Sequence, residues 1–282
     1  MTNVVAVIPT FNEPSLIRDC IVSLRAQGES IEIVIGNAGD PLSDEILQGA
    51  REVRVDPKEF WTGQVIAALH EALSLQPAFI LLCNADTVLG HGTLNVLLQE
   101  ANGQAKKVAA SPAYVASPTG EPKETLYTDQ QSLGFLLYGK ISRRWPDFAH
   151  RESLPPFPTD LIGGQGVLIP VEAFQDASFD PVRFPQYAAD HDFWLQLRKK
   201  GWEIRVCPHA VVINQRGFNR QRKGSLGKTL WWRMTSEYSP ESWVIMRRLR
   251  QKHLGLFVGT ISTVLAFTMR WTLGLPKILR RS

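Results

Sequence analysis

The chain has 282 residues, of which 44% are hydrophobic and 21% are charged, and its formal net charge is +4 at pH 7. This balance is typical of a globular protein with one large domain and excludes a disordered chain. The three cysteines, Cys20, Cys83 and Cys207, are scattered, with no CxxC pair and no histidine spacing of a zinc site. We expect them to be small buried residues in a reducing, cytosolic setting.

The net charge is unevenly distributed along the chain. From Arg198 to the end there are 18 Lys and Arg against three Glu, a formal charge of +15, whereas residues 1–197 carry −11. A basic C-terminal part on an acidic body indicates attraction to phosphate, either in nucleic acid or on an anionic lipid surface.

The N-terminal half alternates strand and helix patterns. Short apolar runs predict strands at 4–8, 31–35, 53–55 and 79–83. Helical spacing of apolar residues predicts helices at 15–26, 44–50, 64–75 and 93–101. This alternation predicts an α/β fold of βαβ units with a Rossmann-like, mainly parallel sheet. The first strand follows the N-terminus without the pattern of a signal peptide, so we expect this part to stay in the cytoplasm.

After residues 108–114 the regular alternation of strand and helix patterns ends, and the pattern of the second half predicts an α+β arrangement. Residues 167–169 and 204–207 predict strands, and residues 192–200 predict a helix closed by Gly201. Long polar, turn-rich segments separate these elements.

Beyond Gly217 the chain is basic and rich in Trp, and residues 254–269 contain no charge. This run is shorter than the roughly 20 residues of a membrane span. Lys and Arg flank it on both sides, so the positive-inside rule gives no orientation. An in-plane or hairpin-like membrane association fits better than a simple span. A buried C-terminal helix that packs on the domain remains the alternative.

The tripeptide Asn84-Ala85-Asp86 directly follows the predicted strand at 79–83. Open α/β sheets bind ligands outside the carboxyl ends of their strands. A carboxylate in that position can coordinate a hard cation through oxygen. Asp86 is therefore the expected metal ligand, and an ordinary turn carboxylate is the alternative.

The segment Val4-Val5-Ala6-Val7-Ile8-Pro9-Thr10-Phe11-Asn12-Glu13 resembles the opening strand and loop of family 2 glycosyltransferases with the GT-A fold. Asn84-Ala85-Asp86, Gly163-Gly164 and Asp190-His191-Asp192 match further motifs of that family in order and spacing over about 4–217. The resemblance implies a nucleotide-sugar half at 1–114 and an acceptor half at 115–217. Residues 218–282 would form a helical, membrane-associating tail.

The resemblance also implies an activity, which is inverting transfer of one sugar from a UDP-, GDP- or dTDP-sugar with Mg²⁺ or Mn²⁺. Asp190 would be the general base that deprotonates the acceptor hydroxyl. Asp192 would cap the following helix and organise the acceptor site, although the reverse assignment is open and both could be caps. Gly163, Gly164 and Gln165 would form the wall between diphosphate and acceptor.

The remaining site residues would bind the donor or the metal. Asp86 and Asn214 are the expected metal ligands. The expected donor-binding residues are Pro9, Thr10, Asn12, Glu13, Asn37, Asp40, Gly63, Asn84 and Arg216. Arg216, Arg220 or Arg222 could assist at the diphosphate.

Three positions depart from the family pattern. Gly36 stands where an aspartate usually recognises the base, and Asn37 or Asp40 could substitute or simply shape the turn. Asn214 stands where a late histidine usually binds the metal, and its carbonyl oxygen would bind more weakly. The Gln-x-x-Arg-Trp motif of processive synthases is missing, which favours addition of a single sugar.

The expected acceptor is a lipid-linked molecule or a growing surface glycan at the cytoplasmic face of the membrane. A sugar nucleotidyltransferase is one alternative, but the Gly-rich, basic loop that it needs is missing after the first strand. The other alternative is a degenerate GT-A member that acts as a membrane-bound binding protein. Trp and Arg of the tail could also stack on bases, but the adjacent apolar run favours lipid, so no nucleic-acid partner is expected.

Overall fold

The structure is a computed structural model of the chain. It describes residues 3–28, 31–103, 105–116, 122–127, 130–132, 139–141, 151, 153–216, 231–232, 234–239 and 242–279, with only the backbone for residues 116, 122–141 and 270–279. Arg220 and Arg222 lie outside these described residues.

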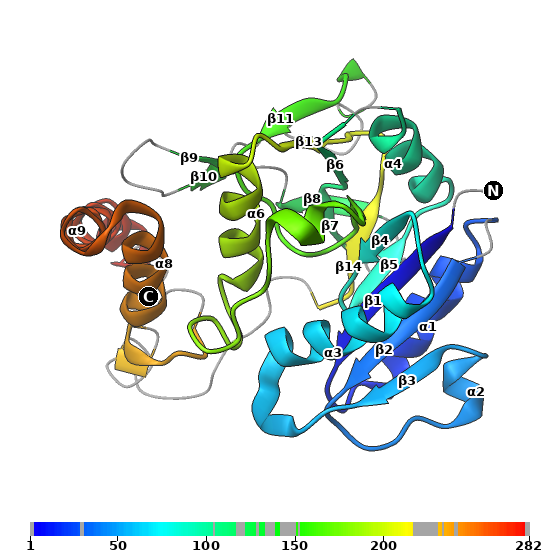
Figure 1. The fold of residues 1–282 in the computed structure, drawn as a ribbon. Helices are drawn as coiled ribbons and strands as arrows, with labels where there is room; N and C mark the ends of the chain where they lie inside the picture. The colour runs from blue at the N-terminus through cyan, green and yellow to red at the C-terminus, as the bar shows by residue number, and fades with distance from the viewer. Residues whose placement is uncertain are drawn as a thin grey trace.

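An eight-stranded sheet forms the centre of the molecule (Figure 1), in the order β11-β13-β6-β12-β4-β1-β2-β3. Its strands are β1 (Val4–Thr10), β2 (Ile31–Asn37), β3 (Arg51–Arg54), β4 (Phe79–Leu82), β6 (Lys107–Ala110), β11 (Phe157–Thr159), β12 (Val167–Pro170) and β13 (Glu203–Val206). Strands β4, β1, β2 and β3 pair in parallel, as do β6 and β13. Only β12 and the edge strand β11 are antiparallel to their neighbours in this sheet. The expected mainly parallel α/β sheet is confirmed.

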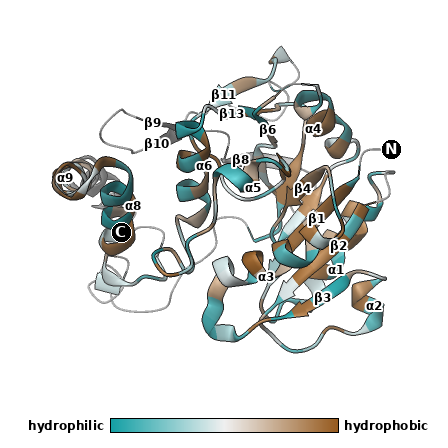
Figure 2. Cartoon of the chain, in the orientation of Figure 1, coloured by the Kyte–Doolittle hydropathy of each residue, from teal (hydrophilic) through white to brown (hydrophobic). Residues whose placement is uncertain are grey.

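Helices cover both faces of this sheet. They are α1 (Pro14–Arg25), α2 (Asp44–Leu47), α3 (Phe60–Ser74), which follows the 3₁₀ turn η1 (Pro57–Glu59), α4 (Thr93–Ala101), α5 (Ala173–Asp176) and α6 (Ala189–Lys199). Successive residues of a strand point to opposite faces. Val5 and Val7 of β1 accordingly enter a core shared with α3 and α6, whereas Ala6 and Ile8 enter a core shared with α1 and α4. Figure 2 shows the apolar strands β1, β2 and β4 between these layers.

A smaller sheet of four strands lies beside the large one, in the order β5-β14-β7-β8. Its strands are β5 (Thr87–Leu89), β14 (Val212–Asn214), β7 (Ala113–Ala116) and β8 (Pro122–Tyr127), and β9 (Gln130–Ser132) pairs separately with β10 (Gly139–Ile141). Strand β5 begins directly after Asp86, and its antiparallel pairing with β14 places Asn214 opposite Thr87. The small sheet therefore brings Asn214 next to the Asn84-Ala85-Asp86 loop.

Two helices, α8 (Trp243–Leu254) and α9 (Leu256–Leu279), follow the described segments of the basic region. Ile245 and Leu249 of α8 are buried in the same core as α3 and α6. Helix α9 packs along α8 (Figure 1). In the described part of the chain, no helix combines the length and apolarity needed to cross a membrane.

The helix bounds differ from the expected ones at three places. The helix expected at 44–50 is only the short α2, because Gln48 takes a left-handed conformation with φ 47°. Helix α3 begins at Phe60 rather than at Gln64. Helix α6 begins at Ala189 rather than at Asp192, after Ala188 with φ 65° as its N-cap. Both aspartates of the Asp190-His191-Asp192 motif therefore lie in the first turn of α6.

Helix α3 approaches β2 closely at Gly36. A Cβ atom at Gly36 would overlap the carbonyl oxygen of Gln64 in α3. Any side chain at position 36 would have to displace α3, so the usual base-recognising aspartate has no room in this chain.

We expect Gly36→Ala to lower the free energy of unfolding by about 1–3 kcal/mol, because the added methyl group overpacks the contact with α3. Urea denaturation monitored by Trp fluorescence measures this change. Alanine is intrinsically better than glycine in a strand by roughly 0.5–1 kcal/mol. Unchanged or increased stability would therefore show that α3 can move away at no cost.

Candidate active site

A cavity of about 580 Å³ lies beyond the carboxyl ends of β1 and β4, against the first turn of α3. Six of the expected site residues line it, namely Pro9, Thr10, Glu13, Asn84, Asp86 and Arg216. A second cavity of about 210 Å³ shares Thr10 and Glu13 with the first and is also lined by Asn12, Asn37 and Asp40. The fold therefore gathers these residues, which are up to about two hundred positions apart in the sequence, around two adjoining cavities.

Asp86 is 7% exposed, and its carboxylate forms no hydrogen bond or ion pair with the residues that the structure describes. The surrounding loop is nevertheless fixed, because the N–H of Gln215 donates to the Asp86 carbonyl at 2.9 Å and Trp61 Nε1 donates to Asn84 Oδ1 at 2.9 Å. A buried charge costs free energy unless it is paired. A rigid loop that presents such a carboxylate at a cavity is chemically suited to a cation.

The two expected metal ligands, Asp86 and Asn214, differ in how well they are suited to bind a cation. Asn214 is 4% exposed, its Oδ1 accepts the N–H of Arg216 at 3.0 Å, and its Nδ2 donates to Gln165 Oε1 at 3.1 Å. The amide of Asn214 thus already helps to hold the loop together. No group of three or more His, Cys, Asp or Glu side chains suited to a metal occurs among the described residues. Mg²⁺ commonly takes one or two protein carboxylates together with substrate phosphates, which fits Asp86 as the main protein ligand.

The thiol next to this loop does not compete for a cation. Cys83 is fully buried and precedes Asn84. Burial raises the pKa of the Cys83 thiol to about 12, so it stays protonated at pH 7. All three cysteines are free and buried, as expected.

Asp190 is not among the residues that line either cavity, and backbone groups hold its carboxylate in place. Its Oδ2 accepts the N–H of Gly164 at 3.2 Å, and its Oδ1 accepts the N–H of His191 at 2.8 Å. A Cβ at Gly164 would lie 3.3 Å from Cζ2 of Trp61, so the indole ring packs on this glycine. Trp61 also lines the cavity and bonds to Asn84. Gly164 and Trp61 therefore link Asp190 to the loop that carries Asp86.

The glycosyl transferase family 2 profile matches residues 5–153, a stretch that contains β1, α3 and the Asp86 loop. The chain belongs to glycosyl transferase family 2. No curated protein sequence matched the chain.

Solved structures show the same fold as this family 2 chain. The structure of TarS 1–349 from S. aureus in complex with UDP aligns with a TM-score of 0.55 and 13% identity, over 96% of this chain and 72% of that one. A second structure of TarS 1–349 aligns with a TM-score of 0.53 and 13% identity, over 97% and 92%.

GalNAc-T7 with UDP, GalNAc and Mn²⁺ aligns with a TM-score of 0.54 and 12% identity over 88% of this chain, and this chain spans half of its length. These matches confirm the GT-A fold.

In this family 2 chain, Asp192 does not have the capping role that we expected. Asp192 does not cap α6, because Ala188 is the N-cap. Its side chain is 0% exposed and lies between Lys252 and His253 of α8. It therefore cannot touch an acceptor in this arrangement. Residues two apart on a helix face nearly opposite directions, so Asp190 and Asp192 of the same turn cannot both face the cavity.

Two of the expected donor-binding residues have structural roles instead. Asn37 is 1% exposed and uses both amide hydrogens, to the carbonyl of Asp40 at 2.7 Å and to Glu52 Oε1 at 2.6 Å. It shapes the turn and has no donor left for a base. Gly63 lies inside α3, where a Cβ would overlap Glu59, and it lines neither cavity. Asp40 keeps an exposed side chain at the smaller cavity.

The structure adds residues that the sequence did not single out. Gln186 and Tyr238 line the large cavity together with Phe60. The ring centroids of Phe60 and Tyr238 are 4.6 Å apart. Gln186 Oε1 accepts the backbone N–H of Trp61 at 3.2 Å. Gln186 precedes α6, so no helical spacing relative to Asp190 points to it. Nothing in the sequence points to Tyr238.

We expect Asp86→Asn to weaken Mn²⁺-dependent binding of UDP by at least about tenfold, because contacts with charged groups are worth roughly 1.5–3 kcal/mol. Stability should be unchanged or higher, since the substitution removes a buried carboxylate that has no hydrogen-bond or ion-pair partner among the described residues. Titration calorimetry and urea denaturation measure the two effects. Asp40→Asn is the matched control and should leave the Mn²⁺ dependence intact. Lower stability with full Mn²⁺ dependence would give Asp86 a structural role instead.

Proposed function

We propose that this protein transfers one sugar, with inversion, from a nucleotide diphosphate sugar to an acceptor hydroxyl, assisted by Mg²⁺ or Mn²⁺. The observation that carries this proposal is the buried Asp86 carboxylate at the cavity, whose Oδ1 has no hydrogen-bond partner among the described residues. Membership of glycosyl transferase family 2 supports the reaction type. UDP in the TarS and GalNAc-T7 structures supports a nucleotide-sugar donor.

The donor half of the site suits a diphosphate. Asp86 would hold the cation, next to the Asn214 amide, and a bound cation would neutralise charge that develops on the leaving diphosphate. Arg216 lines the same cavity and forms an ion pair with Glu13, which also lines it. Exchange of Glu13 for phosphate oxygens would let Arg216 bind the diphosphate through two hydrogen bonds. The hydroxyl of Thr10 is buried there and has no partner among the described residues, so it can bind the donor.

Asp190 is suited to act as the general base. Hydrogen bonds from Gly164 and His191 orient its carboxylate, and the group is only half-buried, so an acceptor can reach it. Asp190 would take the proton of the acceptor hydroxyl as that oxygen attacks the anomeric carbon. The described residues at the cavity offer no activated Ser or Cys nucleophile, so a single displacement with inversion fits the site.

The apolar and polar sides of helix α9 are reversed relative to those of a typical surface helix. Its side toward the protein is small or polar, with Gly259, Ser262, Thr263 and Ala266 all buried. Its outward side is apolar, and the residues exposed by 42–77% are Leu256, Phe257, Val258, Ile261, Val264, Leu265 and Met269. Helices in globular proteins normally bury the apolar face, whereas helices packed in lipid bury small residues against their neighbours.

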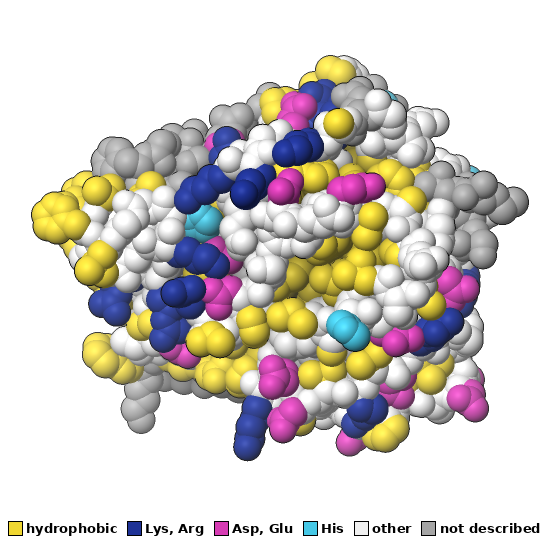
Figure 3. Space-filling view, in the orientation of Figure 1, with side chains coloured by type: hydrophobic (Ala, Val, Ile, Leu, Met, Phe, Trp, Pro, Cys, Tyr) yellow, Lys and Arg dark blue, Asp and Glu magenta, His cyan; other side chains and the backbone are white. Residues whose placement is uncertain are grey.

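This reversed polarity supports in-plane binding of α9 to a membrane surface. Figure 3 shows hydrophobic side chains at the outer edge formed by α9 and Lys and Arg side chains over the adjoining α8. Apolar residues beside basic ones are the combination that binds anionic lipid. We therefore propose that the protein works at the cytoplasmic face of a membrane, on a lipid-linked or surface-glycan acceptor.

We expect Asp190→Asn to lower kcat for transfer by about 10²–10⁴-fold, the usual contribution of a general base, and to leave Mn²⁺-dependent UDP binding unchanged. The donor is first identified by a screen of UDP-, GDP- and dTDP-sugars with Mn²⁺. Retained transfer would remove Asp190 as the base. Lack of turnover by the unaltered protein with every donor would favour the degenerate, binding-only alternative.

We expect Phe257→Ser with Ile261→Ser to reduce binding to anionic phospholipid vesicles by at least tenfold, because burial of each large apolar side chain is worth roughly 1.5–3 kcal/mol. Vesicle co-sedimentation measures the change. Val22→Ser is the matched control, since Val22 is 49% exposed on α1, which lies far from α9 in Figure 1. Equal vesicle binding by the double variant would exclude α9 as the lipid-binding surface.

A further inference from the structure

The segment 180–192 carries two residues of the proposed active site. Gln186 lines the cavity and accepts the N–H of Trp61, and Asp190 bonds to Gly164. The segment also contacts α3, because Thr62 donates its N–H to the Pro185 carbonyl and its hydroxyl to the Phe184 carbonyl. Its conformation therefore determines where both active-site residues lie.

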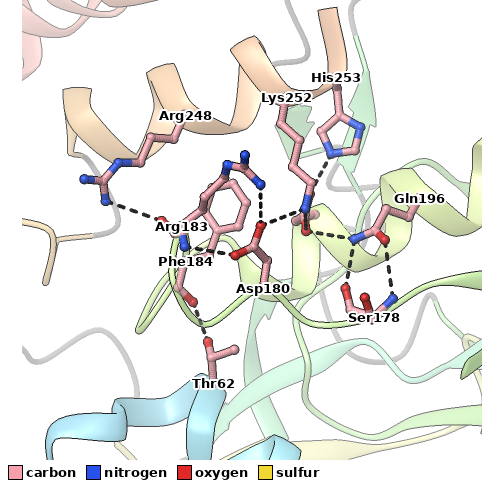
Figure 4. Close-up of polar contacts among 10 residues, drawn as sticks. Thr62, Ser178, Asp180, Arg183, Phe184, Gln196, Arg248, Lys252 and His253 are labelled. Carbon is pink, nitrogen blue, oxygen red and sulfur yellow. Dashed lines mark hydrogen bonds and ion pairs between the residues drawn. The ribbon is translucent and has the colours of Figure 1, made fainter.

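One side chain of α8 bridges the two ends of this segment. Lys252 Nζ donates to Asp180 Oδ2 at 3.1 Å and to Asp192 Oδ2 at 2.8 Å (Figure 4). Burial acts to raise the pKa of Asp180, but hydrogen bonds from Arg183 and Lys252 hold it below its usual value. Asp180 is thus an anion at neutral pH. The single ammonium group closes residues 180–192 into a loop.

The neighbouring residue on α8 completes the contact. His253 Nε2 lies 2.8 Å from Asp192 Oδ1, and the His253 side chain is 3% exposed. Gln196 donates to Asp192 Oδ2 at 2.8 Å and to the Ser178 carbonyl at 2.9 Å. Both carboxylate oxygens of Asp192 are therefore engaged, on the side of α6 away from Asp190. This arrangement fixes the rotation of the first turn of α6.

If Asp192 served packing alone, an apolar residue of similar volume would serve as well as an acid. Replacing a buried ion pair by apolar residues of similar volume is often neutral or stabilising, so the ionic contact is a costly way to attach α8. Attachment is already provided by Ile245 and Leu249, which are buried in the main core. A directional contact, unlike an apolar one, specifies the angle at which α6 presents Asp190.

We propose that Lys252 and His253 of α8 are positioning residues for sugar transfer, which hold the segment 180–192 so that Asp190 and Gln186 meet the acceptor and donor correctly. The proposal rests on the proposed function of Asp190. Under this proposal α8 contributes to catalysis, although the sequence pattern assigned it to a separate tail at 218–282.

The test compares Lys252→Met with Lys252→Arg and with Arg247→Met in the full chain. Arg247 is exposed on the same helix, so its substitution removes the same charge outside the contact. Small displacements of catalytic groups can cost about 10²-fold. We expect Lys252→Met to lower kcat by roughly 10–100-fold while donor KM and Mn²⁺-dependent UDP affinity stay within about twofold. Lys252→Arg should recover most of kcat, and Arg247→Met should have no effect.

Hydrogen–deuterium exchange gives a second readout that needs no turnover. Lys252→Met should speed exchange of the amides in 183–192 and leave β1 and β4 unchanged. Unchanged exchange in that segment, or a loss of kcat matched by Arg247→Met, would overturn the proposal. If the unaltered protein turns over no donor, the proposed function fails, and the exchange result still decides whether Lys252 holds the segment.

Lys252→Met leaves Asp192 as a buried charge with less compensation, which could impair folding. Lys252→Met with Asp192→Asn removes that charge and keeps the bridge to Asp180 broken. We expect this double variant to regain stability without regaining kcat. Recovery of both would show that the contact serves stability alone.

Discussion

The burial of the Asp86 carboxylate without a hydrogen-bond or ion-pair partner among the described residues is the constraint around which the site is organised. Such burial opposes folding, so the loop must be held by other contacts. Parallel pairing of β4 with β1 positions the loop, and bonds from Trp61 to Asn84 and from Gln215 to the Asp86 carbonyl fix its path. The free energy that these contacts supply keeps the carboxylate available at the cavity.

The same contacts explain why residues far apart in the chain contribute to the candidate site. Trp61 at the start of α3 joins the Asp86 loop to Gly164, and Gly164 joins Asp190. The small sheet then brings Asn214 to the other side of the loop. Each active-site group is therefore held by a neighbour from a different element. This mutual support is typical of a rigid, preorganised site.

Much of this arrangement could be predicted from the sequence, because it depends on local pattern. The alternation of apolar runs and helical spacing indicated the parallel sheet, and the position of Asp86 directly after a buried strand indicated the ligand-binding edge. The role of Asp192 could not be read in this way. It depends on α8, which lies 60 residues further along the chain, and no local pattern reports which helix covers a given face. The turn-shaping role of Asn37 was one of the alternatives that the sequence left open, and it depends on the Asn37 side chain reaching Glu52 on the next strand. The role of Gly63 depends on its close contact with Glu59.

The close approach of α3 to Gly36 also restricts which side chains position 36 could acquire. An aspartate at position 36 would collide with the main chain of Gln64, and no choice of side chain at position 64 removes a backbone atom. A variant that regained the usual base contact would first need a shifted or shortened α3. That helix also carries Trp61, so the shift would disturb the Asp86 loop. Asp40, by contrast, lines the smaller cavity with an exposed side chain, which can be exchanged without moving a helix.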